Sequence, residues 1–398
     1  MIPRSTGPLL TGDDVAVNQH RFPALAASDW ARFDGPGGSQ MVDSAIDAMT
    51  DWMRSGRGAN LHGAFAAAIE TEALVARARH AVGELLGGDP GGVIFGPSMT
   101  ALTWRLADAV GQTLAPGDEV VCTRLDHDGN VAPWLSATAR VGATVRFAEV
   151  DRQTGELPVG AVTSVLNERT KWVAVSAASN LMGTVTELGA IVTAAHAAGA
   201  YVAVDAVHAV PHRSIDIAQL GCDTLACSAY KWFGPHVGVL WLSDELMASL
   251  YPAKVRPAPD TGPERWEQGT LPFEALAGVI AAAGYIRDVG YHSIRAHEDR
   301  LLVQMLDGLN TLARVRLVGA PRDRTPTVFF EIERMSAAEA AAAVAEHRIA
   351  VGDGDFYAVE LAHALGVSDG IRAGALHYTS EADVDRLLEA VSTIAERQ

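Results

Sequence analysis

YVAVDAVHAVPHRSIDIAQLGCDTLACSAYKWFGPHVGVLWL, residues 201–242, decides the fold of this chain. It begins with an apolar run typical of a β-strand that ends in Asp205, and a second such run leads to Ser228, Tyr230 and Lys231. Open α/β sheets hold their ligands at the carboxyl ends of their strands. We therefore expect an acid and a lysine at one edge of such a sheet.

Lys231 lies among apolar and aromatic residues that offer an ammonium group little solvation. Burial lowers the pKa of a lysine, which favours an amine that can form a Schiff base. An aspartate that can pair with a pyridinium nitrogen is the other half of a pyridoxal phosphate site. The spacing alone leaves a second interpretation open, in which Asp205 only ends a strand and Lys231 is solvated in a loop.

Apolar, β-branched runs alternate with helical stretches in the part of the chain that precedes this segment. The runs lie at residues 93–95, 118–123, 144–150, 171–177 and 201–205. The segments between them, such as SMTALTWRLADAVGQTL and LGAIVTAAHAAGA, carry small and apolar residues at helical spacing. This alternation predicts a mainly parallel sheet that is covered by helices.

The pattern changes from about residue 290 onward. A helix over RLLVQMLDGLNTL precedes strands around RVRLVG and TVFFEIE, an Ala/Glu helix, a short IAV strand, the IRAGALHYT segment and a terminal helix. This order predicts a smaller α+β domain. We place the large domain at residues 20–285 and the small domain at residues 1–19 and 286–398. Residues 251–272 hold five prolines and form either a linker or a functional loop.

The composition excludes several classes of protein. The 398 residues include 31 Lys and Arg against 48 Asp and Glu, which gives a formal charge of −17, and 48% of the residues are hydrophobic. Such a chain forms a globular core, and its acidic balance disfavours nucleic acid and anionic membranes as partners. The chain has only three cysteines, and its sequence shows neither the apolar core of a signal peptide nor an apolar window of membrane-spanning length. These features predict a cytoplasmic protein.

Three further segments place polar residues at the ends of predicted strands. RLDHDGNVAPW holds His127, which can stack on a flat cofactor or serve as a packing residue. GPSMTALTWRL offers Ser98, Thr100 and backbone N–H groups to an anion at the start of a helix, although any helix cap has this pattern. SNLMGT holds Asn180 at a position where most asparagines only form turns.

Four motifs, in their order and with their gaps, resemble the class V aminotransferase family of fold-type I pyridoxal phosphate enzymes. They are DHDGNVAPW, SNLMGT, VDAVH and CSAYKWFGPHVGVLW. The resemblance is strongest to the cysteine desulfurase-like branch. It extends through ERWEQGT, DGDFYAVELAHALGV and IRAGALHYTSEADVDRLLEAV and so covers nearly the whole chain. It implies an aspartate aminotransferase-like α/β fold with a mainly parallel seven-stranded sheet, and a homodimer with shared active sites.

The resemblance also implies roles for residues around the cofactor ring. Lys231 would hold pyridoxal 5′-phosphate in a Schiff base and shuttle the substrate Cα proton. Asp205 would keep the ring nitrogen protonated, and His127 would stack on the ring face. Asn180 and His208 would lie near the phenolic oxygen, although much of the family has glutamine in place of His208.

The phosphate group of the cofactor is assigned in the same way. Ser98, the backbone of Met99 and Ser228 would hold it, together with Thr270 from a second subunit. Tyr230 stands where many relatives carry a histidine that touches the phosphate, and a phenol can still donate one hydrogen bond there.

The substrate side of the site follows from the tail motifs. Arg372 matches the arginine that grips the α-carboxylate of an amino acid, a task that suits a planar, bidentate fork. Phe356, Tyr357, His62 and Arg256 fall in segments that the resemblance places near the mouth of the site. Each of these four is equally plausible as a packing or surface residue.

Cysteine usage departs from the pattern of true desulfurases. Those enzymes carry a loop cysteine shortly before the carboxylate arginine, and its thiolate attacks the substrate sulfur. Residues 349–372 contain no cysteine, and Cys122, Cys222 and Cys227 have the sequence context of small core residues. We therefore predict a C–S β-lyase that converts an S-substituted cysteine into a thiol, pyruvate and ammonia.

Several alternatives stay open. They are decarboxylation coupled to oxidative deamination of an S-cysteinyl intermediate in secondary metabolism, an aminotransferase and an epimerase. A desulfurase and a non-catalytic scaffold are less favoured, the scaffold because Lys231 and Asp205 are both retained. A metal site is discounted, since Pro211 disfavours the helix that would bring His208 and His212 onto one face. GPGGSQ at residues 35–40 lacks the spacing of a dinucleotide loop and predicts a turn near the domain entrance.

Overall fold

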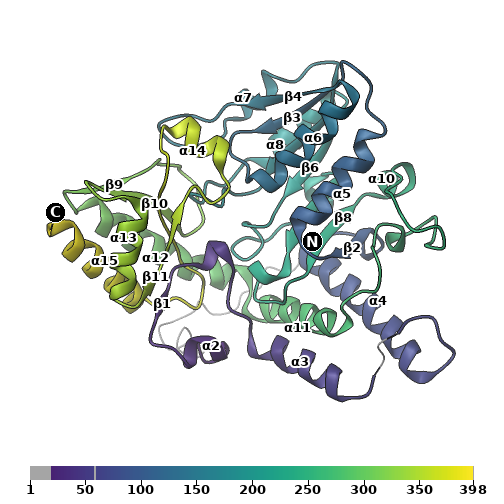
Figure 1. Cartoon of the computed structure of the whole chain (residues 1–398), viewed down its shortest axis with the longest axis horizontal. Helices are drawn as coiled ribbons and strands as arrows, with labels where there is room; N and C mark the ends of the chain where they lie inside the picture. Colours follow the sequence, from purple (N-terminus) through teal and green to yellow (C-terminus); the bar gives the residue numbers. More distant parts are fainter. Residues whose placement is uncertain (1–18, 58–59, 398) are drawn as a thin grey trace.

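The structure is a computed structural model that describes residues 19–57 and 60–397 (Figure 1). Its largest sheet has seven strands in the order β2-β8-β7-β6-β5-β3-β4. Neighbours from β7 to β4 pair in parallel, whereas β8 is antiparallel to both β7 and β2. The prediction of a mainly parallel seven-stranded sheet is confirmed. The strands are β2 (Val93–Gly96), β3 (Glu119–Thr123), β4 (Thr144–Ala148), β5 (Thr170–Ser176), β6 (Tyr201–Asp205), β7 (Thr224–Ser228) and β8 (Gly238–Leu242).

Helices cover both faces of this sheet, and the strand sequences explain why. Along β6, Val202 and Val204 join one apolar cluster and Ala203 joins another, as the twofold period of a strand requires. On one side, α11 packs against α3 and α4. The helices of this part are α3 (Asp43–Arg54), α4 (Ala66–Leu86), α5 (Met99–Gly111), α6 (Ala132–Val141), α7 (Val159–Thr163), α8 (Leu188–Ala197), α9 (Ile217–Leu220), α10 (Asp244–Ser249) and α11 (Phe273–Val289).

A second sheet of four antiparallel strands, in the order β12-β13-β10-β9, lies on the left in Figure 1. An apolar cluster joins this sheet to α12, α13 and α15. The elements are β9 (Val315–Leu317), β10 (Thr327–Ile332), β12 (Gly352–Gly354), β13 (Gly370–Gly374), α12 (Tyr291–Asn310), α13 (Ala337–Glu346), α14 (Val359–Leu365) and α15 (Glu381–Glu396). The predicted smaller α+β unit thus has its own sheet and helices.

A short strand near the start of the described chain joins the C-terminal part. β1 (Ala31–Arg32) pairs in parallel with β11 (Ile349–Ala350), and α2 (Pro23–Ala26) precedes it. The predicted boundary at residues 285 and 286 stays a prediction, and residues 1–18 of the predicted small domain lie outside the described residues. Within the described part of the chain, no helix is long and apolar enough to cross a membrane.

Candidate active site

A cavity opens at the carboxyl ends of the central strands. Three of these strands, β5, β6 and β7, end in Ser176, Asp205 and Ser228. Ten residues singled out from the sequence line the cavity, namely Ser98, Met99, Thr100, His127, Asn180, Asp205, His208, Ser228, Tyr230 and Lys231. The structure thus places all ten around one space, while their individual roles stay predictions.

Asp205 is buried and Lys231 is half-buried in the wall of this cavity. Lys231 ends the 3₁₀ helix η4 (Ala229–Lys231), and its Nζ donates a hydrogen bond to the carbonyl oxygen of Pro36. Burial, reinforced by the charge of Arg372, lowers the pKa of Lys231 to about 7. Burial also raises the pKa of Asp205 to about 7, although its Oδ1 accepts a hydrogen bond from the Val207 N–H at 2.9 Å. The cavity therefore holds an amine that is readily neutral near pH 7, which is the reactive form of a lysine nucleophile.

His127 is held in one tautomer by its own loop. It precedes the 3₁₀ helix η3 (Asp128–Asn130), and its Nδ1 accepts a hydrogen bond from the Gly129 N–H at 2.9 Å. Burial, together with the charges of Lys231 and Arg372, lowers the pKa of His127 to about 4. The ring is therefore neutral at pH 7, with its proton on Nε2.

Asn180 connects the cavity to the substrate-side residues. Its backbone carbonyl accepts a hydrogen bond from Arg372 Nη1 at 2.8 Å, and its Nδ2 donates to the Phe356 carbonyl at 2.8 Å. Arg372 is 7% exposed, and the Cζ of its guanidinium lies 3.8 Å from the centre of the Phe356 ring. Arg372 lies on β13, so the four-stranded sheet brings a cation to the edge of a cavity that the seven-stranded sheet forms.

The two aromatic residues that the resemblance places near the mouth of the site have an unusual backbone. Phe356 and Tyr357 have φ angles of 54° and 60°, in the left-handed region, where a residue with a side chain is strained by about 1–2 kcal/mol. The Asn180 contact described above and the Asp128 N–H, which donates to the Tyr357 carbonyl at 2.7 Å, hold this pair. The Tyr357 ring is well exposed and lies 5.4 Å from the His127 ring.

The start of α5 forms a tight corner of the cavity. Ser98 caps the helix by accepting a hydrogen bond from the Ala101 N–H, and the Met99 N–H donates to Ser228 Oγ at 3.0 Å. Gly238 of β8 approaches closely here, since a Cβ at this position would lie 2.3 Å from the Ser98 carbonyl carbon. A helix N-terminus with neighbouring hydroxyl groups suits a phosphate.

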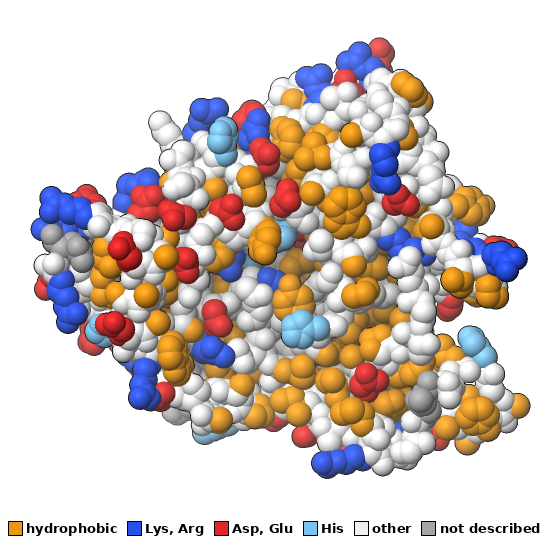
Figure 2. All heavy atoms as spheres, viewed as in Figure 1, with side chains coloured by type: hydrophobic (Ala, Val, Ile, Leu, Met, Phe, Trp, Pro, Cys, Tyr) orange, Lys and Arg blue, Asp and Glu red, His pale blue; other side chains and the backbone are white. Residues whose placement is uncertain are grey.

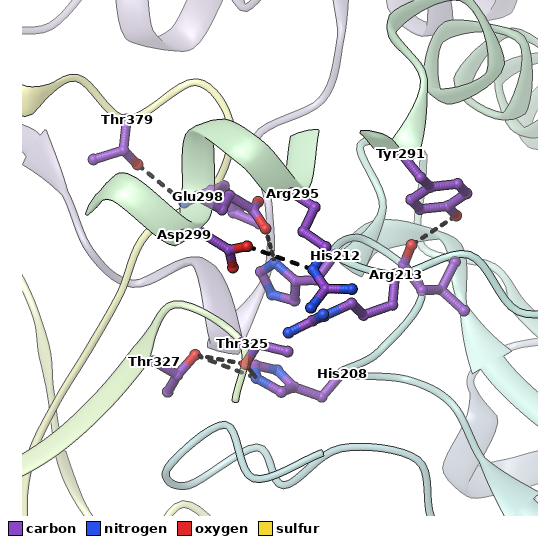
Figure 3. Close-up of polar contacts among 12 residues, drawn as sticks. His208, His212, Arg213, Tyr291, Arg295, Glu298, Asp299, Thr325, Thr327 and Thr379 are labelled. Atoms are coloured by element: carbon purple, nitrogen blue, oxygen red, sulfur yellow. Dashed lines mark hydrogen bonds and ion pairs between the residues drawn. The ribbon is translucent and has the colours of Figure 1, made fainter. Parts of the chain in front are cut away.

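His208 is buried in a polar cluster that reaches away from the cavity (Figure 3). Its Nε2 lies 3.0 Å from Thr325 Oγ1 and 3.2 Å from Thr327 Oγ1. As expected around Pro211, no regular helix forms in this segment. Turns nevertheless bring the ring centres of His208 and His212 to 5.2 Å.

The two histidines nevertheless have protein partners rather than a metal-type arrangement. His212 Nδ1 lies 2.8 Å from Oε2 of Glu298, and both side chains are buried. The residues that the structure describes contain no group of three or more His, Cys, Asp or Glu side chains that could hold a metal ion.

Other predicted residues lie elsewhere. Thr270 and Arg256 are exposed and do not line the cavity of their own chain. His62 is also exposed, and its Nδ1 lies 3.7 Å from Glu72. A contribution of Thr270 to a second subunit stays a prediction.

The GPGGSQ segment lies closer to the chemistry than predicted. It forms the 3₁₀ helix η1 (Gly35–Gly37) against the lysine, where Pro36 accepts the Lys231 hydrogen bond and the Ser39 N–H donates to the Tyr230 carbonyl. A Cβ at Gly37 would lie 3.6 Å from Arg372 Nη2. The run of glycines was the only feature of the sequence that could have indicated this contact with Lys231, and such a run is also typical of an ordinary turn.

Ser176, Ala178 and Val207, which were not singled out from the sequence, also line the cavity. Ser176 pairs with Asp205 in the register of β5 and β6. Its place at the end of a predicted strand is the signal from which it could have been found.

Comparisons with known proteins agree with this geometry. The family model of class-V aminotransferases matches residues 32–387. An uncharacterized protein of Mycobacterium tuberculosis is 33% identical over 96% of this chain and 99% of its own length. A cysteine desulfurase of Dickeya dadantii is 32% identical over 76% of each chain. The apo structure of a cysteine desulfurase from Thermococcus onnurineus NA1 has the same fold, with a TM-score of 0.92 and 24% identity over 99% of this chain and 100% of that chain.

Proposed function

Because the chain belongs to the class-V aminotransferase family, we propose that it is a pyridoxal phosphate-dependent C–S β-lyase. It is a cysteine desulfurase-like enzyme that acts on a sulfur-containing amino acid. In the proposed reaction, an S-substituted cysteine and water give a thiol, pyruvate and ammonia. The observation that carries the proposal is a cavity lined by a half-buried lysine and a buried aspartate, with no cysteine in its wall among the described residues.

The residues around the cavity fit pyridoxal 5′-phosphate. Lys231 offers an amine and Asp205 a carboxylate, while Oδ1 of Asn180 is buried and has no hydrogen-bond partner among the described residues. Ser228 and the N-terminus of α5 suit the phosphate group. When bound, this cofactor supplies an electron sink that makes the Cα–H of an amino acid acidic.

The side chains of the chain itself would divide the remaining work. Asp205 would hold the proton at the pyridine nitrogen, because its carboxylate is fixed by the Val207 N–H and faces away from water. His127 is neutral and half-buried, so it would contact the ring without adding a charge. Arg372 would bind the substrate carboxylate through the part of its guanidinium that Asn180 does not occupy.

Lys231 is the proposed base for the substrate. Its lowered pKa lets Nζ accept the Cα proton near neutral pH. The Cβ–S bond then breaks, and the sulfur leaves as a thiolate that takes up a proton. Water releases the remaining carbon and nitrogen as pyruvate and ammonia. The hydrogen bond from Lys231 to the Pro36 carbonyl gives the free amine a defined place between these steps.

The cysteines support a lyase over a persulfide-forming desulfurase. Cys122, Cys222 and Cys227 are all buried. Burial raises the pKa of Cys222 and Cys227 to about 12 and that of Cys122 well above its ordinary value. A sulfur nucleophile needs the opposite, an accessible thiol with a low pKa.

We also propose that two chains share their active sites. Thr270 is exposed and lies outside the cavity of its own chain, which leaves it available to a partner. Figure 2 shows hydrophobic side chains gathered in the lower right of the view, where Figure 1 draws α4 and α11. Exposed apolar residues on α3, α4 and the segment just before α4 include Ile46, Met53, Phe65 and Ile69. Light scattering should give twice 41.9 kDa, and an active monomer would contradict the sharing.

The proposed reaction is tested with purified protein loaded with pyridoxal phosphate. An absorbance scan is followed by mass spectrometry of the products from cysteine, S-alkyl cysteines and larger cysteine conjugates. We expect a yellow protein that releases equal amounts of thiol and pyruvate from an S-substituted cysteine. Carbon dioxide and an aldehyde would instead indicate decarboxylating deamination. A protein that binds no cofactor would overturn the proposal altogether.

A further inference from the structure

A second carboxylate lies directly behind the wall of the cavity, at Asp126. The side chain is buried, with 1% of its surface exposed, and it does not line the cavity itself. Asp126 immediately precedes His127 in the chain. A buried carboxylate is costly unless hydrogen bonds satisfy it, so its presence beside the site calls for a physical reason.

Four donors from three parts of the chain satisfy this carboxylate. Oδ2 accepts hydrogen bonds from the Thr123 N–H at 3.1 Å and from Thr123 Oγ1. Oδ1 accepts from Asn130 Nδ2 at 3.0 Å and from Ser176 Oγ at 2.6 Å. Both oxygens act as acceptors, which is the pattern of an ionised carboxylate.

These contacts join two separate parts of the cavity wall. Asn130 is the last residue of η3, and His127 caps the start of η3. The hydrogen bond from Asn130 to Asp126 therefore fixes the loop that carries the His127 imidazole. Ser176 lines the cavity at the end of β5 and pairs in register with Asp205 on β6. A displaced Asp126 side chain would therefore release the His127 loop and the strand end next to Asp205 together.

We propose that Asp126 is a positioning residue of the cofactor site, which holds His127 and Ser176 in the places from which they line the cavity. This inference rests on the proposed cofactor. The negative charge of Asp126 also reaches Asp205, where it adds to burial in raising the pKa of that carboxyl group. The combined negative charge of Asp126 and Asp205 favours the protonated form of any group that binds against Asp205, such as the ring nitrogen of the proposed cofactor.

The test compares the binding of pyridoxal phosphate to the apo forms of the parent protein and two variants. Asp126→Asn removes the charge and replaces an acceptor by an amide that cannot accept from all four donors. Thr123→Val is the matched control, because it removes one donor to the same carboxylate but leaves the charge and the links to Asn130 and Ser176. Thermal unfolding shows how far each variant is destabilised, and visible circular dichroism reports how the bound cofactor is seated.

For Asp126→Asn we expect the dissociation constant of pyridoxal phosphate to rise at least about tenfold, as for a lost buried hydrogen bond to a charged group. The visible circular dichroism band should also shrink or shift. Thr123→Val should lower the melting temperature but keep the parental dissociation constant and band. Equal dissociation constants and bands in the parent protein and Asp126→Asn would overturn the inference.

Ser176→Ala keeps the test available if Asp126→Asn does not fold. It breaks only the link from Asp126 to the end of β5, and we expect a rise in the dissociation constant of about threefold or more. A parental value in this variant would also overturn the inference. If the parent protein itself binds no pyridoxal phosphate, the proposed function fails with it, so the two failures are distinguishable.

Discussion

Replacing Arg372 with methionine should remove the group that holds the substrate carboxylate while preserving most of the buried side-chain volume. Arg372 is 7% exposed as a residue. Its guanidinium lies with Cζ 3.8 Å from the centre of the Phe356 ring and makes one hydrogen bond among the described residues, to the Asn180 carbonyl. The rest of its fork is therefore available to a ligand. A buried, charge-assisted pair of this kind contributes about 2–4 kcal/mol, which corresponds to a fall in kcat/KM of about 30- to 900-fold.

Steady-state kinetics with an S-substituted cysteine and with its methyl ester would measure this contribution. The ester keeps the Cα proton and the leaving group but carries no carboxylate charge. We expect the substitution to lower kcat/KM strongly for the acid and little for the ester. Arg316→Met, on β9 of the same sheet, removes an exposed cation that pairs with Glu331 and should leave both substrates unaffected. An equal fall for acid and ester in Arg372→Met would refute the assignment.

Three further changes probe the cavity. Lys231→Ala should abolish turnover and the visible absorbance of the bound cofactor. Lys171, whose side chain is exposed, serves as the control, and Lys171→Ala should leave both intact. An unchanged spectrum in Lys231→Ala would rule out Lys231 as the point where the cofactor is attached. The exposed Tyr357 ring can stack on the benzyl group of S-benzyl cysteine, and such an aromatic pair contributes about 0.5–1.5 kcal/mol. Tyr357→Ala should therefore raise KM about two- to twelvefold for S-benzyl cysteine relative to S-methyl cysteine. Equal changes in KM for the two substrates would contradict this stacking. Because burial lowers the pKa of His127 to about 4, the stability that its neutral ring contributes is complete above about pH 6.5 and is lost as the pH falls through about 4. In urea unfolding of the apo protein, the difference in unfolding free energy between parent and His127→Asn should therefore shrink by about 2.5 kcal/mol from about pH 7.5 to about pH 4.5, and a constant difference would contradict the lowered pKa.

The sequence predicted the parts of the cavity that depend on where a strand ends. Asp205 and Ser228 end apolar runs that form neighbouring parallel strands. Parallel strands bring their carboxyl ends to the same edge of a sheet, independently of contacts with distant parts of the chain. Lys231 follows within three residues of Ser228, so its burial could be inferred from the apolar residues on both sides. These features are local in the chain, and one segment contains them.

Contacts between remote segments were not predictable in the same way. The proximity of His208 and His212 depends on turns that form where a proline would break a helix. The η1 segment meets Lys231 through residues 195 positions apart in the chain, next to a strand, β1, that pairs with the distant β11. Asp126 shows no periodicity or motif of its own, and only the arrival of Ser176 from another strand reveals its connection to the cavity.

The pairing of β1 with β11 has a consequence for the order in which the protein assembles. Ala31 leaves the ribosome long before its partner Ile349 has been made, and the intervening residues include every strand of the seven-stranded sheet. The segment that carries Pro36 is anchored at Asp34 by a bridge to Gly374, which is made later still. During synthesis the lysine side of the cavity can thus form with η1 held by the contacts of Ser39 with Tyr230 and Phe233, while its second anchor at Asp34 cannot yet form. We expect the nascent chain to be able to take up its cofactor before this second anchor fixes η1 beside the lysine.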